Sequence, residues 1–244
     1  MFSLSFELNC FYSIHGMKGN LMEETPFSFV PYQGTQYEPA EMLIRSESYY
    51  QWMNQRRTLR EFSDRPVPLA VIENIVMTAS TAPSGAHKQP WTFAIVADPT
   101  IKAKIREAAE QEEHENYHGR MSDEWLEDLL PFATDWHKPF LELAPYLIVV
   151  FRKAYDLLPD GTQRKNYYVQ ESVGIACGIL LAAIHHAGLV ALTHTPSPMN
   201  FLQNILQRPE NERPFLLIPV GYPADDAQVP NLVRKEKADV ITIY

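Results

Sequence analysis

Residues 56–62 read RRTLREF and, two dozen residues later, residues 82–87 read APSGAH. The first stretch places three arginines within five residues, and their planar guanidinium donors suit a phosphate monoester. In the second stretch Gly85 and Ala86 present little side chain, so the backbone can lie against a flat ligand. Taken alone, an Arg-Arg pair is usually a solvated surface feature and a Pro-Ser-Gly run is usually a turn. Together they provide a phosphate clamp followed by a loop of close approach, which is what bound flavin mononucleotide (FMN) needs.

The bulk composition is that of an ordinary globular protein. The 244 residues are 45% hydrophobic and 21% charged, which favours one large domain with a substantial core. The formal net charge of -9 argues against nucleic acid or an anionic membrane as a partner, because both require a basic surface. A basic cluster in such an acidic chain is therefore expected to serve a local purpose.

The two cysteines, Cys10 and Cys177, provide neither a disulfide framework nor metal-ligand spacing. Cys177 lies in an apolar run and is expected to be a buried free thiol, which fits a reducing compartment. No stretch approaches the roughly 20 apolar residues of a membrane span, and residues 1–17 lack the basic start of a signal peptide. We expect a cytoplasmic protein with no membrane and no metal partner.

Hydrophobic periodicity predicts alternating helices and strands. Helices are expected at residues 47–55, 68–81, 101–114, 168–187 and 201–207, and strands at residues 91–97, 146–151, 189–195 and 215–222. Strands separated by helices predict an α/β or α+β layer sandwich. Residues 1–40 lack clean periodicity and are expected to be an arm or a poorly ordered tail ahead of a single domain over residues 41–244.

Two further segments depart from this alternation. Residues 113–143 carry many aromatic and charged side chains without a settled period, which favours a lid over permanent disorder. The C-terminal tail ends in a β-branched run, residues 239–244, which could add a strand to another sheet, such as that of a partner.

Several of these segments resemble the flavin-dependent nitroreductase-fold superfamily and, within it, the iodotyrosine deiodinase family. The matching stretches are RRTLR (56–60), TAPSGAH (81–87), QPWTF (89–93), ESVGIACGIL (171–180), TP (195–196), PVGYP (219–223) and VP (229–230). The resemblance runs from about residue 56 to the C-terminus. It implies an α+β three-layer sandwich, with a mostly antiparallel sheet flanked by helices, in a strand-exchanged homodimer.

The resemblance also implies which residues hold FMN. The phosphate and ribityl-pyrimidine region would be held by Arg56, Arg57, Thr58, Leu59 and Arg60, with Arg234 joining from the tail. Pro83, Ser84 and Gly85 would contact the cofactor, in their own or in the partner subunit's site, and Thr193 and His194 would add backbone contacts. The family places a hydroxyl near flavin N5 at the position of Thr195, which favours one-electron steps over hydride transfer. Without the resemblance, Thr195 is an ordinary residue at the end of a strand.

In the lid, the resemblance implies a site for the amino-acid end of a halotyrosine. Glu113, four residues before Tyr117, and Lys138 match the family's lid pattern, and a carboxylate with a lysine is the minimal complement of a zwitterion. Surface Glu and Lys are usually only solvated. The backbone amide of Ala86 would bind the phenolate oxygen, which favours halotyrosine because a halogen lowers the phenol pKa below about 10.

These assignments predict an FMN-dependent oxidoreductase that reductively dehalogenates halotyrosines such as 3-iodotyrosine, with NAD(P)H as the ultimate reductant. One alternative is a generic NAD(P)H-dependent nitroreductase or quinone reductase, which would need neither the lid residues nor Thr195. Another is a non-catalytic protein that sequesters halotyrosine or flavin.

Overall fold

A computed structural model describes residues 28–244 of the chain, which divides into two units between Ile44 and Arg45. Residues 28–38 contain no helix or strand, and α1 (Pro39–Asn54) begins directly after them. The helix predicted at residues 47–55 therefore starts eight residues earlier than expected. The predicted arm is shortened accordingly, and its first 27 residues lie outside the described part of the chain.

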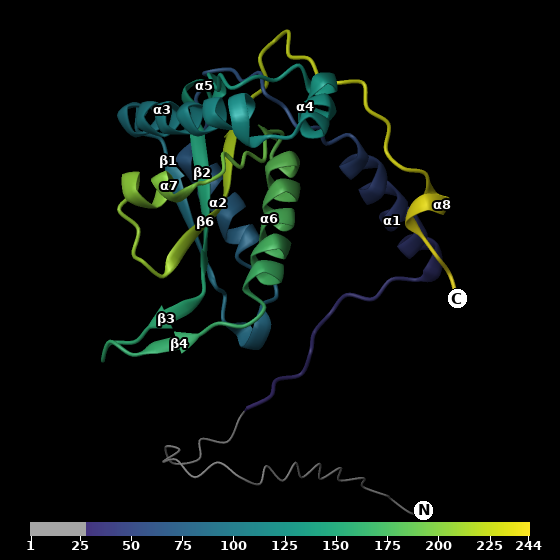
Figure 1. Cartoon of the computed structure of the whole chain (residues 1–244). Helices are drawn as coiled ribbons and strands as arrows, with labels where there is room; N and C mark the ends of the chain where they lie inside the picture. Colours follow the sequence, from purple (N-terminus) through teal and green to yellow (C-terminus); the bar gives the residue numbers. More distant parts are fainter. Residues whose placement is uncertain (1–27) are drawn as a thin grey trace, which may run out of the picture. The chain divides into compact units, whose positions relative to one another are not determined.

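The second unit is built on a four-stranded sheet with the order β1-β2-β6-β5, in which every neighbouring pair is antiparallel. The strands are β1 (Trp91–Val96), β2 (Tyr146–Lys153), β6 (Glu212–Gly221) and β5 (Val190–Ala191). A separate hairpin of β3 (Tyr155–Leu157) and β4 (Gln163–Lys165) extends from one end of the sheet, opposite the end near α4 and α5 (Figure 1). Between the two classes left open by periodicity, the antiparallel pairing selects α+β.

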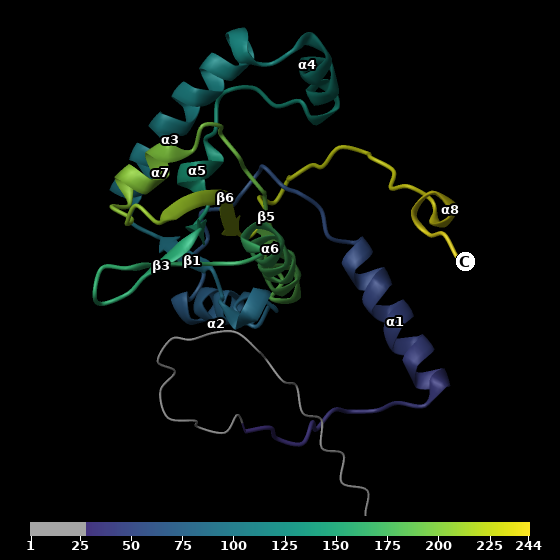
Figure 2. The ribbon, with the colours of Figure 1, turned by 60° about the horizontal axis from the view of Figure 1, so that its bottom comes forward.

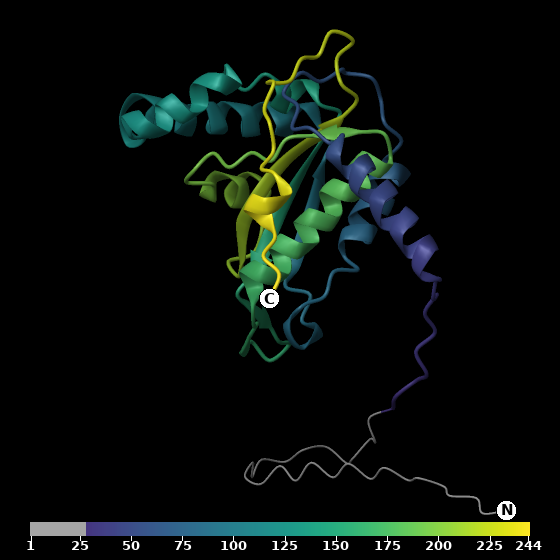
Figure 3. The same ribbon diagram turned by 90° about the vertical axis from the view of Figure 1, so that its right-hand side faces the viewer.

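Helices cover both faces of the sheet (Figure 2). One face carries α2 (Leu69–Ala79) and α6 (Val169–His186), and the other carries α3 (Pro99–Glu115), α5 (Phe140–Leu143) and α7 (Asn200–Ile205). Figure 3 shows the strands between α7 on one side and α6 on the other. The expected three-layer sandwich is confirmed.

Strand β2 shows why its sequence is apolar without interruption. Ile148 and Val150 pack into the core under α2 and α6, whereas Leu147, Val149 and Phe151 pack into the core under α3, α5 and α7. Successive side chains of a strand point to opposite faces, and both faces are covered here. A strand buried on two sides therefore has no polar positions to alternate with.

The helix boundaries follow from their capping residues. Asp98 accepts a hydrogen bond from the Ile101 amide at 2.9 Å, with Pro99 in the first turn of α3. Gly188, at φ 74°, follows α6, and its amide donates to the His185 carbonyl, as a C-terminal glycine cap requires. By length and composition α6 could cross a membrane, but its buried face, which includes Leu180 and Ile184, packs in the core.

The strand predicted at residues 189–195 is wrong in its extent. Only Val190–Ala191 form β5, although residues 192–194 continue along β6 in the same register, with an isolated bridge between His194 and Leu217. The interruption has a simple cause. Pro219 lies opposite Leu192 and has no N–H to donate, so the ladder lacks a bond there.

Two other expectations are corrected. The segment at residues 113–143 is not irregular but largely helical, with the π-helical turn η2 (Asn116–Arg120), α4 (Asp123–Leu129) and the 3-10 turn η3 (Leu130–Phe132) before α5. In α4, the Ser122 side chain accepts from the Trp125 amide at 3.3 Å. In the tail, α8 (Lys237–Val240) takes up residues 239 and 240 of the predicted β-branched strand, and the pairing of residues 241–244 with a partner's sheet stays a prediction.

Candidate functional site

The lid encloses a cavity of about 230 Å³ against the segment after β5. Its polar lining joins Glu113 from the end of α3, Tyr117 from η2 and Lys138 from the residues before α5. The opposite wall contains Thr193, His194 and Thr195, with Arg60 beside them. The predicted lid residues and the predicted mechanistic threonine are thus brought together, although 82 residues separate Glu113 from Thr195 in the sequence.

Glu113 and Lys138 form a buried ion pair with 3.5 Å between carboxylate oxygen and ammonium nitrogen. Lys138 Nζ also donates to the Asp135 carbonyl and to Thr134 Oγ1. Burial raises the pKa of Glu113, and Lys138 opposes that shift. Burial likewise lowers the pKa of Lys138, and Glu113 opposes it. Each charge is therefore tolerated in the cavity mainly because the other is present.

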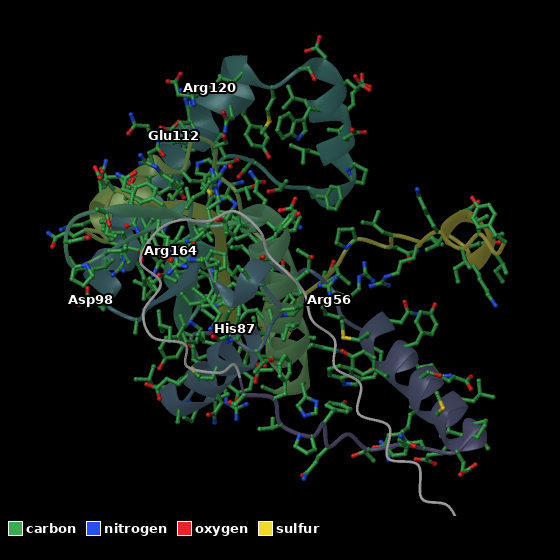
Figure 4. All side chains as sticks on the ribbon, turned by 90° about the horizontal axis from the view of Figure 1, so that it is seen from below. Arg56, His87, Asp98, Glu112, Arg120 and Arg164 are labelled. Carbon is green, nitrogen blue, oxygen red and sulfur yellow. The ribbon has the colours of Figure 1, made fainter. Side chains whose placement is uncertain are left out.

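Tyr117 lines the same cavity as this ion pair. Its hydroxyl donates to the Thr134 carbonyl at 3.3 Å, and Lys138 Nζ lies 5.5 Å from its ring centroid. Burial raises the pKa of the Tyr117 phenol, so that it stays a neutral hydrogen-bonding group. Where α3 leads into the lid, Glu112 and Arg120 form an ion pair at 2.7 Å (Figure 4).

Residues 193–195 alternate in burial as in a strand. Thr193 and Thr195 are exposed, whereas His194 is buried and meets the edge of Phe140, with ring centroids 5.6 Å apart. Burial lowers the pKa of His194 to about 3, and the charges of Lys138 and Arg60 add to the shift. The two threonine side chains therefore face outward, on the opposite side from a neutral imidazole.

The predicted arginine cluster lines a second cavity, of about 290 Å³. Arg56, Arg57, Thr58 and Arg60 come from the segment after α1, and Arg234 comes from the C-terminal tail. Arg234 donates to the Arg56 carbonyl at 2.9 Å, so Arg56 lies beside the tail (Figure 4). Arg57 donates to the Pro230 carbonyl. The sequence expectation that Arg234 joins the cluster agrees with this placement.

The second cavity carries the positive charge that an anion-binding site requires. Within residues 28–244, none of the four arginines forms an ion pair with a carboxylate. Burial lowers the pKa of Arg56, and the positive charges of Arg234 and Arg57 lower it further. Uncompensated guanidinium groups in an acidic chain are suited to a phosphate.

Arg60 lines both cavities, which are therefore adjacent. Its guanidinium lies 5.4 Å from the ring centroid of Phe132, at the end of η3. Leu59 differs from its neighbours, because its side chain is buried and its amide donates to the Ala191 carbonyl. Leu59 lines a third cavity, which it shares with Arg56 and Arg57, and does not line the second.

The loop with Pro83, Ser84, Gly85 and Ala86 does not join either cavity. It precedes β1 at Trp91, whereas the arginine segment pairs with β5 at the Val96 end of the sheet. Five residue steps along β1 separate these ends by about 17 Å. Within one protomer, the residues predicted to hold the flavin therefore form two groups that lie apart.

The neighbouring chain leaves no room for a side chain at Gly85. A Cβ at Gly85 would lie 2.9 Å from the Tyr167 carbonyl oxygen and 2.9 Å from the Tyr168 ring. Ala86 and His87 follow with positive φ angles of 49° and 54°, in the left-handed region that residues other than glycine seldom adopt. Ala86 itself is exposed.

Comparison with known proteins identifies the family. A family model described as "Nitroreductase family" matches residues 53–222. The iodotyrosine deiodinase of Haliscomenobacter hydrossis is 78% identical over 223 residues, which cover 91% of this chain and all of that protein. The chain belongs to the nitroreductase family and, within it, to the iodotyrosine deiodinases.

Other deiodinases support this membership. The iodotyrosine deiodinase of Danio rerio is 50% identical over 224 residues, 91% of this chain and 75% of that protein. A crystal structure of oxidized iodotyrosine deiodinase bound to FMN and 3-iodo-L-tyrosine matches with a TM-score of 0.69 at 34% identity, over 80% of this chain and 98% of that one.

The deiodinase-type lid also contains polar residues that the sequence did not single out. Thr134 accepts from both Tyr117 and Lys138, and the buried Asn116 donates to the Ser197 carbonyl. Nothing in the local sequence distinguishes Thr134 from a solvated threonine. Asn116 stands between Glu113 and Tyr117, and this position within the lid pattern was the available signal.

Proposed function

We propose that this chain is an FMN-dependent reductive dehalogenase that converts mono- and diiodotyrosine to tyrosine and iodide. The observation that carries the proposal is the meeting of Glu113, Tyr117 and Lys138 with Thr195 around one cavity. Membership of the iodotyrosine deiodinases supports it. The reaction consumes two electrons and one proton for each carbon–iodine bond that is replaced by a carbon–hydrogen bond.

The residues present fit FMN. Arg56, Arg57 and Arg234 would hold the phosphate, because their guanidinium groups share a cavity without a carboxylate. Arg60 belongs to both cavities, so the ring system would extend toward Thr193 and Thr195. When bound, FMN supplies the two electrons of the reaction. The Thr195 hydroxyl would donate a hydrogen bond at flavin N5.

On ligand binding, Glu113 and Lys138 would each exchange the other's charge for a charged group of the halotyrosine. Glu113 would accept from the ammonium group of a halotyrosine, and Lys138 would donate to its carboxylate. Both groups already lie within 3.5 Å of one another in a cavity that excludes most water, where charge-assisted hydrogen bonds are strong. Tyr117 would add its hydroxyl and ring edge, and closing the lid would exclude water from the flavin.

A second copy of the chain would complete the site. The Ala86 amide, proposed to bind the phenolate oxygen, belongs to the loop at the opposite end of the sheet from the arginine cavity. The outer face of α6 is suited to a partner. Ile175 is 47% exposed, and Cβ atoms built at Gly174 and Gly178 meet no atom within 4 Å. We therefore propose a homodimer in which each loop serves the partner's flavin.

The oligomeric state has its own test. The variant Ile175→Glu is expected to be a monomer in light scattering and to lose FMN affinity, because a buried charge opposes association. A wild-type protein that is monomeric while it binds FMN and deiodinates would contradict the dimer proposal.

Iodide release from 3-iodotyrosine, with dithionite in place of the proposed NAD(P)H, tests the activity. We expect release by the wild type, a large loss in Thr195→Ala with halotyrosine binding retained, and little change in Thr193→Ala. Rapid NAD(P)H-dependent nitroaromatic reduction without iodide release would instead support the nitroreductase alternative. Binding without turnover would support a sequestering protein.

A further inference from the structure

Asn116 connects the lid to the segment that contains Thr195. It is buried, it lies at the start of η2 between Glu113 and Tyr117, and its Nδ2 donates to the Ser197 carbonyl at 3.0 Å. Ser197 follows Thr195 by two residues and is 81 residues from Asn116 in the sequence. A single side chain thus joins the proposed substrate-binding turn to the chain on the flavin side.

Asn116 itself is firmly held. Its amide donates to the carbonyl groups of Glu112 and Glu113 in the last turn of α3, and its carbonyl accepts from the Met121 amide at 2.9 Å. Its side chain therefore moves with the turn that carries the lid residues. A displacement of that turn would be passed to the Ser197 carbonyl.

The segment with residues 195–198, whose Ser197 carbonyl accepts the bond from Asn116, makes few other hydrogen bonds. Within residues 28–244, the bond from Asn116 is the only hydrogen bond made by the backbone of residues 195–198. Pro196 and Pro198 have no N–H to donate, which removes two of the possible bonds. One residue earlier, His194 is fixed, because it exchanges two backbone bonds with Leu217 at 2.8 and 3.0 Å.

Thr195 therefore lies between a fixed point and a point that follows the lid. On one side is the bridge of His194 to β6, and on the other is the carbonyl of Ser197 bound by Asn116. Removal of the Asn116 bond would leave Thr195 attached on one side only. The local structure on that side would then be free to open.

We propose that Asn116 is a positioning residue that couples occupation of the lid to the placement of the Thr195 hydroxyl. When the amino-acid end of a halotyrosine orders Glu113 and Tyr117, the Asn116 side chain fixes Ser197 and, with it, Thr195. A ligand in the lid thereby prepares the flavin side for turnover. This inference rests on the proposed function for the roles of the lid and of Thr195.

Hydrogen exchange in the full FMN-loaded protein, with and without 3-iodotyrosine, tests the coupling. In the wild type we expect the ligand to protect amides of both the lid, residues 113–138, and residues 193–199. In Asn116→Asp, which keeps the size but removes the donor, we expect protection of the lid alone. Asn116→Ala, which adds no carboxyl, is expected to behave in the same way.

Kinetics provide a second readout. We expect kcat for iodide release to fall roughly tenfold in both variants, the scale of one buried hydrogen bond, while the affinity for 3-iodotyrosine changes less than threefold. The matched control is Asn211→Asp, since the buried Asn211 also donates to one backbone carbonyl, that of Tyr155 at 2.8 Å, away from both cavities. It should lower thermal stability without altering ligand-induced protection of residues 193–199.

The outcomes separate the two levels of the proposal. If Asn116→Asp and Asn116→Ala pass protection to residues 193–199 as the wild type does, with kcat unchanged, the coupling is wrong and the proposed function stands. If 3-iodotyrosine does not protect the lid of the wild type, the proposed function itself fails.

Discussion

Replacing Lys138 by methionine would leave the Glu113 carboxylate buried without the ammonium group that now lies 3.5 Å away. The two residues are only 4% and 7% exposed, so water can replace little of the lost interaction. Breaking a buried ion pair by removing one partner typically destabilises a protein by about 3–5 kcal/mol. We expect this variant to be less stable than the wild type at neutral pH.

Glu113 has one way to limit that loss, which is to take up a proton. For a glutamate with an ordinary pKa of about 4.3, protonation at pH 7 requires about 3.7 kcal/mol, because each pH unit corresponds to about 1.36 kcal/mol. At pH 5 it requires about 1 kcal/mol. The part of the destabilisation by Lys138→Met that comes from the unpaired Glu113 charge should therefore be at most about 3.7 kcal/mol at pH 7 and at most about 1 kcal/mol at pH 5.

The sign follows from the pKa of Glu113. Burial already raises it in the folded protein, and the loss of Lys138 removes the interaction that lowers it. A carboxyl whose folded-state pKa lies above its unfolded value destabilises the fold as the pH rises through that range. The variant should therefore lose stability relative to the wild type between pH 5 and pH 7.

Denaturant unfolding at both pH values, at one protein concentration and with FMN but without halotyrosine, measures the difference. Lys102→Met is the matched control, because Lys102 is 8% exposed and its ammonium donates to the carbonyl groups of Glu142 and Ala144, so no buried carboxylate is left behind. The double variant Glu113→Gln/Lys138→Met should lose the pH dependence. An equal destabilisation by Lys138→Met at pH 5 and pH 7 would refute the reasoning.

Three further predictions follow from the same structure. Arg56→Gln should weaken FMN binding by roughly 10- to 100-fold, the scale of a charged hydrogen bond. Arg164→Gln, in the exposed strand β4, should leave FMN binding unchanged. Flavin fluorescence titration measures both affinities, and equal losses would contradict the anion site. The folded pKa of His194 is about 3, below its unfolded value of about 6.5. The free energy of unfolding should therefore fall by up to about 1.36 kcal/mol per pH unit as the pH drops below about 6.5. His194→Gln should remove that slope in pH-dependent unfolding, and an unchanged slope would argue against the low pKa of His194. Gly85→Ala should destabilise the fold by about 1–3 kcal/mol, because the new Cβ would clash with Tyr167 and Tyr168. Gly119→Ala, whose Cβ would meet no atom within 4 Å, should change the melting temperature little. Similar shifts in both variants would show that Tyr167 and Tyr168 move aside without a measurable cost.

Local sequence patterns were sufficient to predict most helices and strands. The apolar run of β2, the capping residue Asp98 and the terminal glycine Gly188 each act within a few residues, so their effects could be predicted without the fold. The strand at residues 189–195 could not be bounded in this way. Its pairing ends early because Pro219, more than 20 residues away, lies opposite it.

The candidate site divides in the same manner. Side-chain chemistry and spacing singled out the arginines, because phosphate recognition requires charges that a sequence displays directly, whereas the lid residues and Thr195 were predicted only through the resemblance to the deiodinases. Only the tertiary structure determined which of them meet. It joins Thr195 to Glu113 and Lys138, brings Arg234 to Arg56, and leaves the Gly85 loop at the other end of the sheet, because strand register and helix packing set distances that no local pattern contains.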